Sequence, residues 1–183
     1  MANSDWINLI AAIIVGGGTL FLGIMAWRTI RLTSTIQKAE KRERLLNEII
    51  EWAVDVGKCG SHIDFLCLSA EIDEEPWGEL NLPTLQSSLR ELEQRGEYIA
   101  KIANSLDKPL LTTVRKVKEE VMGYRLSIDA IFVKVKLGAE YNLSMILAPL
   151  MESDSLVNYT DNLITEAVKI KTKDIGKGDE KNS

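Results

Sequence analysis

Apolar and polar positions follow one another along most of this chain with the period of an α-helix. Over residues 110–135 and again over residues 85–106, apolar side chains recur alternately four and three residues apart. Side chains at these spacings share one face of a helix, so both segments are expected to be amphipathic helices. The two series are Leu110, Val114, Val117, Val121, Tyr124, Ile128, Ile131 and Val135, and Leu85, Leu89, Leu92, Gly96, Ile99, Ala103 and Leu106.

A third helical pattern fills residues 34–57, and its continuous apolar face begins near Leu45. Gly57 and Gly60 interrupt this pattern, since glycine is a poor helix former. A second piece is expected to resume the helix to about Ile72. The stretch that follows, DEEPWGELNLP, contains two prolines and a glycine and is therefore expected to be a loop.

The remaining boundaries carry recognisable capping residues. Asp107 can act as an N-cap with Pro109 in the first helical turn, and Ser153 can cap a last helix. No segment alternates convincingly with a period of two, and short links favour antiparallel neighbours. The sequence therefore predicts an all-α fold in which an antiparallel bundle of about four helices covers residues 45–172. Residues 173–183 are expected to form a disordered tail.

The N-terminal part of the chain has a different pattern, because no residue from Trp6 to Trp27 is charged. At about 1.5 Å per residue, this run is roughly 33 Å long as a helix, enough to cross a hydrocarbon core of about 30 Å. A cleaved signal peptide is the alternative, but it would begin with basic residues, and the start MANSDW has none. The sequence predicts a single transmembrane helix over 6–27 after a short extracytoplasmic segment, residues 1–5.

Basic residues follow the uncharged run and none precedes it. Because Lys and Arg flanking a membrane helix stay preferentially in the cytoplasm, residues 28–183 are expected there and the N-terminus outside. Residues 28–44 are predicted to form a basic juxtamembrane stalk that contacts lipid headgroups. Its basic side chains are Arg28, Arg31, Lys38, Lys41, Arg42 and Arg44.

Small residues form a stripe along the predicted membrane helix. They are Ala12, Gly16, Thr19, Gly23 and Ala26. Small-xxx-small pairs let two helix backbones approach closely in lipid. We therefore expect either a homo-oligomer or packing against another membrane protein, although glycine is also simply common in membrane helices.

The charge and the cysteine content indicate which classes of partner and cofactor to expect. The net charge is −5 despite the basic stalk, so the helical domain is acidic and a nucleic-acid partner is not expected. Thiolate and imidazole groups are common zinc ligands, and the sequence offers them in Cys59, His62 and Cys67. However, no second Cys or His pair completes a set of four ligands. Cysteines packed in a helical core are the preferred interpretation, and no metal or cofactor is expected.

Two further stretches are candidate contact surfaces. The loop region gathers acidic residues around a tryptophan, which can anchor a protein interface or fold back over the end of the bundle. Its residues are Glu71, Asp73, Glu74, Glu75 and Trp77. The apolar stretch LSMILAPLM, residues 143–151, is too short to cross a bilayer. It either caps the core or forms a docking patch.

No nucleotide-binding loop, hydrolase triad or Glu-x-x-His pair appears in the sequence, so the chain is not expected to be an enzyme or to bind a small-molecule substrate. The favoured hypothesis is a single-pass membrane protein whose helical bundle acts as an interaction or scaffold module at the cytoplasmic face. One alternative is a signal relay or regulatory subunit of a larger membrane complex. Another is a metal-dependent enzyme that uses Cys59, His62 and Cys67.

Overall fold

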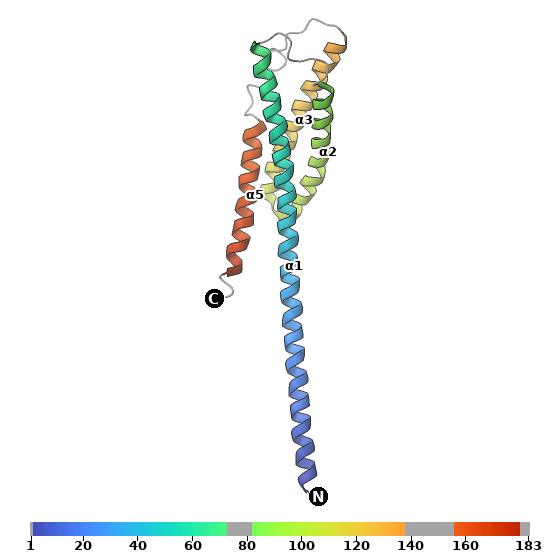
Figure 1. Ribbon diagram of the computed structural model, residues 1–183, viewed down its shortest axis with the longest axis vertical. Helices are drawn as coiled ribbons and strands as arrows, with labels where there is room; N and C mark the ends of the chain where they lie inside the picture. Colours follow the sequence, from blue (N-terminus) through green and yellow to red (C-terminus); the bar gives the residue numbers. More distant parts are fainter. Residues whose placement is uncertain (1, 73–81, 138–155, 180–183) are drawn as a thin grey trace. The chain divides into compact units, whose positions relative to one another are not determined.

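The computed structural model describes residues 2–72, 82–137 and 156–179. Within those ranges the side chains of residues 2–5, 7–13, 67–72, 135 and 174–179 are not described. The described part of the chain is all-helical, as the sequence predicts. Its four helices are α1 (Ala2–Ile72), α2 (Leu82–Leu106), α3 (Lys108–Lys136) and α5 (Leu156–Asp179), shown in Figure 1.

The chain divides into two units, Met1–Arg42 and Glu43–Ser183. The second unit contains α2, α3, α5 and the part of α1 from Glu43 onward. Every buried apolar residue that the structure describes lies in this second unit, where side chains of the four helices form one apolar cluster. The second unit is thus the predicted helical bundle.

Neighbouring helices of the bundle run antiparallel. Between α1 and α2, Glu48 accepts a hydrogen bond from Tyr98, whereas Trp52, further along α1, donates to the carbonyl of Leu92, which comes earlier in α2. Between α1 and α5, Gly60 lies against Leu156 at the start of α5, and Asn47 accepts a hydrogen bond from Lys171 near its end. Ion pairs between α2 and α3 follow the same reversed order and are described below.

The core uses the residues that the four-three spacing selects. Each of the seven described residues in the α3 series is no more than 1% exposed, and in α2 the series is buried from Leu85 to Ala103. Trp52 contributes the bulkiest fully buried side chain from α1, and its indole Nε1 donates to the Leu92 carbonyl at 2.9 Å. A buried indole N–H needs such a partner, so this bond fixes the ring in one orientation.

The prediction that Gly57 and Gly60 interrupt the first helix is wrong, because α1 is unbroken through both. Each glycine instead lies where α5 approaches closely. A Cβ at Gly57 would meet the Thr160 hydroxyl oxygen at 3.0 Å, and one at Gly60 would meet the Leu156 Cβ at 3.1 Å. Packing against α5 therefore offsets the helix-propensity cost of about 1 kcal/mol for each glycine.

The link between α2 and α3 is the single residue Asp107. Its N–H donates to the Ala103 carbonyl at 3.0 Å, and its own carbonyl accepts from Leu111 at 3.1 Å. Asp107 thus occupies the predicted N-cap position, with Pro109 in the first turn of α3. Such a short link makes α2 and α3 a helical hairpin, as the sequence predicts.

At the C-terminal end the structure differs from the expected disordered tail, because α5 continues to Asp179. Each residue added to an existing helix gains a backbone hydrogen bond, so charged residues can extend the helix beyond its apolar face. The end of the apolar series at Ile170 therefore does not mark the end of the helix. The apolar stretch 143–151 lies outside the described residues.

Among the residues that the structure describes, no helix is long and apolar enough to cross a membrane. The predicted transmembrane helix over 6–27 is therefore not supported by the fold. The described side chains of this stretch begin, apart from Trp6, at Ile14, glycine occupies 16–18 and 23, and Arg28 ends the uncharged run. Glycine and the nearby arginines lower the mean hydropathy of this part of α1.

Candidate functional site

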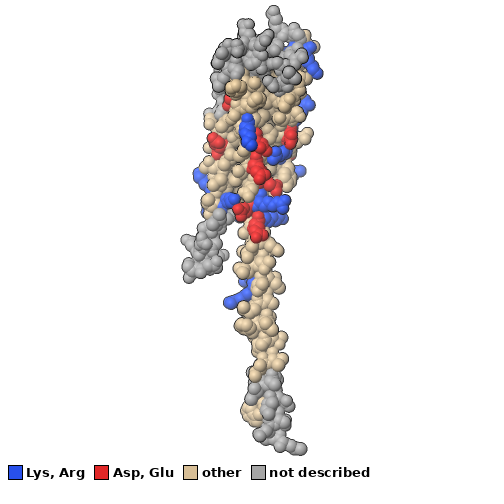
Figure 2. Space-filling model, in the orientation of Figure 1, with Lys and Arg blue, Asp and Glu red and all other residues tan. Residues whose placement is uncertain are grey.

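Residues 14–32 of α1 carry an unusually apolar exposed surface. Leu20 and Leu22 are each 69% exposed, and the other large apolar side chains of this stretch are also exposed. Figure 2 shows this part of α1 as a surface nearly free of charge, whereas acidic and basic side chains are interspersed over the bundle. A contiguous exposed apolar surface marks contact with a membrane or with another protein.

The small-residue stripe lies within this surface. A Cβ added at Gly16 or at Gly23 would meet no described atom within 4 Å. Thr19 is also exposed, and its hydroxyl donates to the Val15 carbonyl at 2.7 Å, which satisfies the hydroxyl within the helix. Ala26 is exposed, while the side chain of Ala12 lies outside the described part of the structure. The described stripe is therefore open to a second helix.

The basic residues of the predicted stalk have different surroundings. Arg28, Arg31, Lys38 and Lys41 are exposed, and the guanidinium of Arg31 lies 5.3 Å from the centre of the Trp27 ring. Arg42 is half-buried. The last of them, Arg44, pairs with a carboxylate one helical turn away at 3.6 Å.

Of the three residues of the alternative metal site, the structure describes the side chains of Cys59 and His62. Cys59 and His62 line a groove of about 370 Å3 between α1 and α2, with Asp55 and Glu91 among the other lining residues. No group of three potential ligands among the described residues could hold a metal ion, and the side chain of Cys67 is not described. Burial raises the pKa of the Cys59 thiol to about 11, so it stays protonated at neutral pH.

The acidic contact surface expected around Trp77 cannot be placed. Asp73, Glu74, Glu75 and Trp77 lie outside the described residues, and so does the side chain of Glu71.

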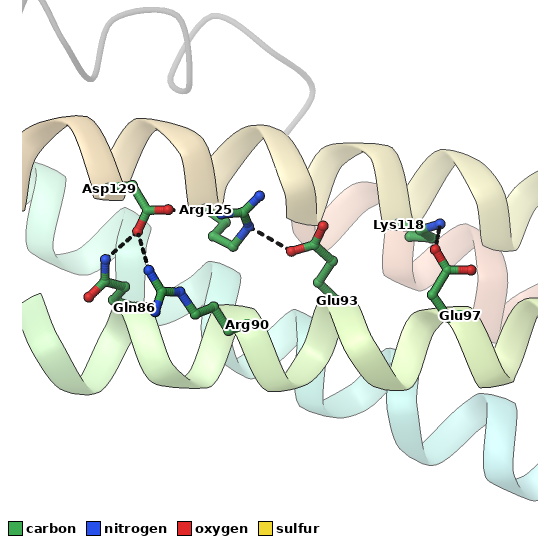
Figure 3. Close-up of polar contacts among 7 residues, drawn as sticks. All are labelled: Gln86, Arg90, Glu93, Glu97, Lys118, Arg125 and Asp129. Atoms are coloured by element: carbon green, nitrogen blue, oxygen red, sulfur yellow. Dashed lines mark hydrogen bonds and ion pairs between the residues drawn. The ribbon is translucent and has the colours of Figure 1, made fainter.

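A ladder of polar contacts runs along the α2–α3 hairpin, as Figure 3 shows. Arg125 on α3 pairs with Glu93 on α2 at 2.6 Å and with Asp129 one turn along its own helix at 2.8 Å. Asp129 also lies 3.5 Å from Arg90 of α2, and its carboxylate accepts a hydrogen bond from Gln86.

A second pair of the ladder joins Lys118 of α3 to Glu97 of α2. The hydrogen bond from Lys118, together with its charge, lowers the pKa of the Glu97 carboxyl. These cross-helix pairs fix the register of the hairpin. Of the whole ladder, only the spacing of Arg125 and Asp129, four residues apart on one helix, was visible in the sequence.

Sequence reasoning also missed an apolar seam on the outer side of α3. Met122, Leu126, Val133 and Leu137 are exposed, and Ala130 lies in line with them. The helical period that identified the buried face could have identified this second series, because its members are spaced by four, four, three and four residues. We call these five residues the α3 seam.

Comparison with known proteins adds no relative from which a function could be transferred. No protein-family model matches this sequence, and no curated protein or solved structure matches it.

Proposed function

We propose that this chain is a single-pass membrane protein whose helical bundle acts as an interaction module at the cytoplasmic face. The observation that carries the proposal is the exposed apolar surface of residues 14–32. Transfer of apolar surface from water to hydrocarbon is favourable by roughly 25 cal/mol per Å2. The uncharged sequence from Trp6 to Trp27, with an aromatic residue at each end, supports a bilayer as the environment that covers this surface.

The proposed orientation rests on the basic residues that follow the uncharged run. Arg28 and Arg31 are exposed at its end, and no Lys or Arg precedes it. Positive charges of this kind are retained on the cytoplasmic side during insertion. The bundle is therefore proposed to lie in the cytoplasm, with the exposed cations of the stalk against anionic headgroups.

Assembly through the small-residue stripe is the second part of the proposal. Gly16 and Gly23 leave open space on one side of the helix, which suits close approach of a second α1 helix. The Gly16→Ile, Gly23→Ile double variant should lose self-association in a membrane dimerisation assay. Gly17→Ile is the matched control, because Gly17 is equally open but lies on a different side of the helix. Equal loss in the control would argue against the stripe.

Recruitment of another protein is the third part, and the acidic residues around Trp77 are its proposed contact surface. The test is purification of the full chain from its native membrane in a mild detergent, followed by mass spectrometry of the proteins retained in near-equal amounts. A variant with Trp77→Ala and amides in place of Glu71, Asp73, Glu74 and Glu75 serves as the comparison. A partner retained by the natural chain and lost by this variant would support recruitment. Retention of the same proteins by both, or of none, would count against this surface.

A signal relay is a second candidate that one observation favours. α1 is a single helix from Ala2 to Ile72, so the helix with the apolar surface also supplies core residues such as Trp52. A change in packing between two apolar segments could then bias the bundle that shares the helix. The Gly16→Ile, Gly23→Ile variant tests this candidate as well. A relay predicts altered hydrogen exchange in the bundle of that variant, whereas passive anchoring predicts no change.

A further inference from the structure

The α3 seam is an exposed apolar surface separate from residues 14–32 of α1. Leu126 is 53% exposed on α3, whose opposite side forms part of the core, and Leu137, the residue that directly follows α3, is 75% exposed. The seam residues recur at helical spacing from Met122 to Leu137, so they form a continuous line along α3. Within the described part of the chain, this line does not belong to the buried core of the bundle.

The shape of the seam fits a helix better than a flat surface. Only one apolar residue is exposed per turn, which makes the seam narrow, as in coiled coils, whereas a membrane-surface helix presents a broad apolar face with Trp or Phe. Ala130 leaves room for close approach of a partner backbone, and Met122 can adapt to the shape of a partner side chain. The seam is thus suited to receive the apolar stripe of one amphipathic helix.

Charges beside the seam indicate what kind of helix it receives. Four basic side chains are exposed near its two ends, with one exposed acidic side chain among them. The basic residues are Arg115, Lys116, Lys134 and Lys136, and the acidic residue is Glu119. This excess of positive charge contrasts with the net charge of −5 of the whole chain. It favours an acidic partner.

A second copy of this chain fits less well. Antiparallel pairing of two α3 seams about Leu126 would bring Glu119 of one copy near Lys134 of the other, but it would also place Lys116 directly opposite Lys136. Such like charges at an interface disfavour the pairing. We infer that the α3 seam docks an amphipathic helix of another protein, with its apolar stripe on Leu126 and its neighbours and acidic side chains against the flanking lysines. This inference rests on the proposed role in binding proteins and is independent of the glycine stripe.

Protection of a cysteine at the centre of the seam tests the inference. The full chain carries Leu126→Cys together with Cys59→Ala and Cys67→Ala, and is reconstituted into vesicles of neutral phosphatidylcholine. The probe is a designed helical peptide with leucines spaced four and three residues apart and glutamates beside them. Saturating peptide should slow maleimide labelling by about tenfold, because the core of an interface excludes water. A peptide with lysine in place of each glutamate should slow it far less.

Val168→Cys in the same background is the matched control, since Val168 is 42% exposed on α5. Its labelling rate should not respond to the peptide. Four results would overturn the inference. Slowing at Leu126→Cys with rising protein-to-lipid ratio alone would indicate a second copy, and slowing when anionic lipid replaces neutral lipid would indicate the membrane surface. Unchanged labelling under all conditions, or equal slowing by both peptides, would show that the seam does not select an acidic helix.

Failure of this inference can be distinguished from failure of the proposed function. Loss of a co-purifying partner in the variant around Trp77 tests recruitment without involving the α3 seam. If the peptide leaves labelling at Leu126→Cys unchanged while that partner is still recruited, only the inference about the seam is wrong.

Discussion

Gly96 on α2 provides the sharpest test of how the bundle packs. A Cβ there would meet the Trp52 ring at 3.0 Å and the Cγ of Lys118 at 3.3 Å. Lys118 has a flexible side chain, but Trp52 is fully buried and held by its hydrogen bond to the Leu92 carbonyl. Gly96→Ala therefore forces the indole or its helix to shift. Gly123 is the natural comparison, because it is also helical and a Cβ there would meet nothing within 4 Å.

Both substitutions gain the same stabilisation from helix propensity, but only Gly96→Ala adds a cost of overpacking. Replacing a helical glycine with alanine stabilises by about 0.8–1.0 kcal/mol in both cases. Overpacking at Gly96 costs about 1–3 kcal/mol, whereas Gly123 has no such cost. Gly96→Ala should thus lower the free energy of unfolding by between about 0 and 2 kcal/mol, while Gly123→Ala raises it by about 1 kcal/mol. The difference between the two variants isolates the packing cost.

Urea unfolding of the full chain in a mild detergent, followed by far-ultraviolet circular dichroism, measures both variants. Repeating Gly96→Ala in a Trp52→Phe background should reduce its effect, because phenylalanine lacks the ring atom that the new methyl group meets. The reasoning is refuted if Gly96→Ala is as stable as Gly123→Ala. Such a result would mean that α1 and α2 are not packed as closely at this point as the structure has them.

Three further predictions concern polar groups of the bundle. Arg125→Met removes the cation shared by two partly buried carboxylates and should destabilise the bundle by about 1–2 kcal/mol in urea unfolding; a neutral effect would contradict it. Lys118→Met should raise the pKa of Glu97, as a carboxyl titration by NMR would show; an unchanged pKa would exclude the pairing. With a pKa of about 11, Cys59 should react with iodoacetamide only slowly at neutral pH, with a rate that rises towards pH 11; fast alkylation at pH 7 would contradict its burial.

The helical bundle could be predicted from the sequence because its apolar series is regular. Seven described positions of the α3 series are buried, and Asp107 alone links α2 to α3. The continuity of α1 could not be predicted, because intrinsic propensity makes Gly57 and Gly60 helix breakers. Their close contacts with α5 involve residues about a hundred positions away, and no local pattern contains that information.

The candidate surfaces could be predicted less completely. Glycines 16 and 23 are open as the small-residue stripe requires, but the residues around Trp77 lie outside the described structure. The polar ladder depends on which turn of α2 lies beside which turn of α3, and periodicity within one helix does not determine this register. The α3 seam follows the same helical period as the buried face of α3, so the period alone does not show which of the two apolar series faces the core.

Stable insertion of α1 in a membrane tests the central claim most directly. Membranes from cells that make the full tagged chain are washed with alkaline carbonate and separated into pellet and supernatant. The account predicts that the natural chain stays in the pellet and that a Leu20→Arg, Leu22→Arg variant is released, because charge in hydrocarbon is unfavourable. Release of the natural chain into the supernatant would contradict the membrane anchor and would leave the exposed apolar surface of α1 to be covered by another protein.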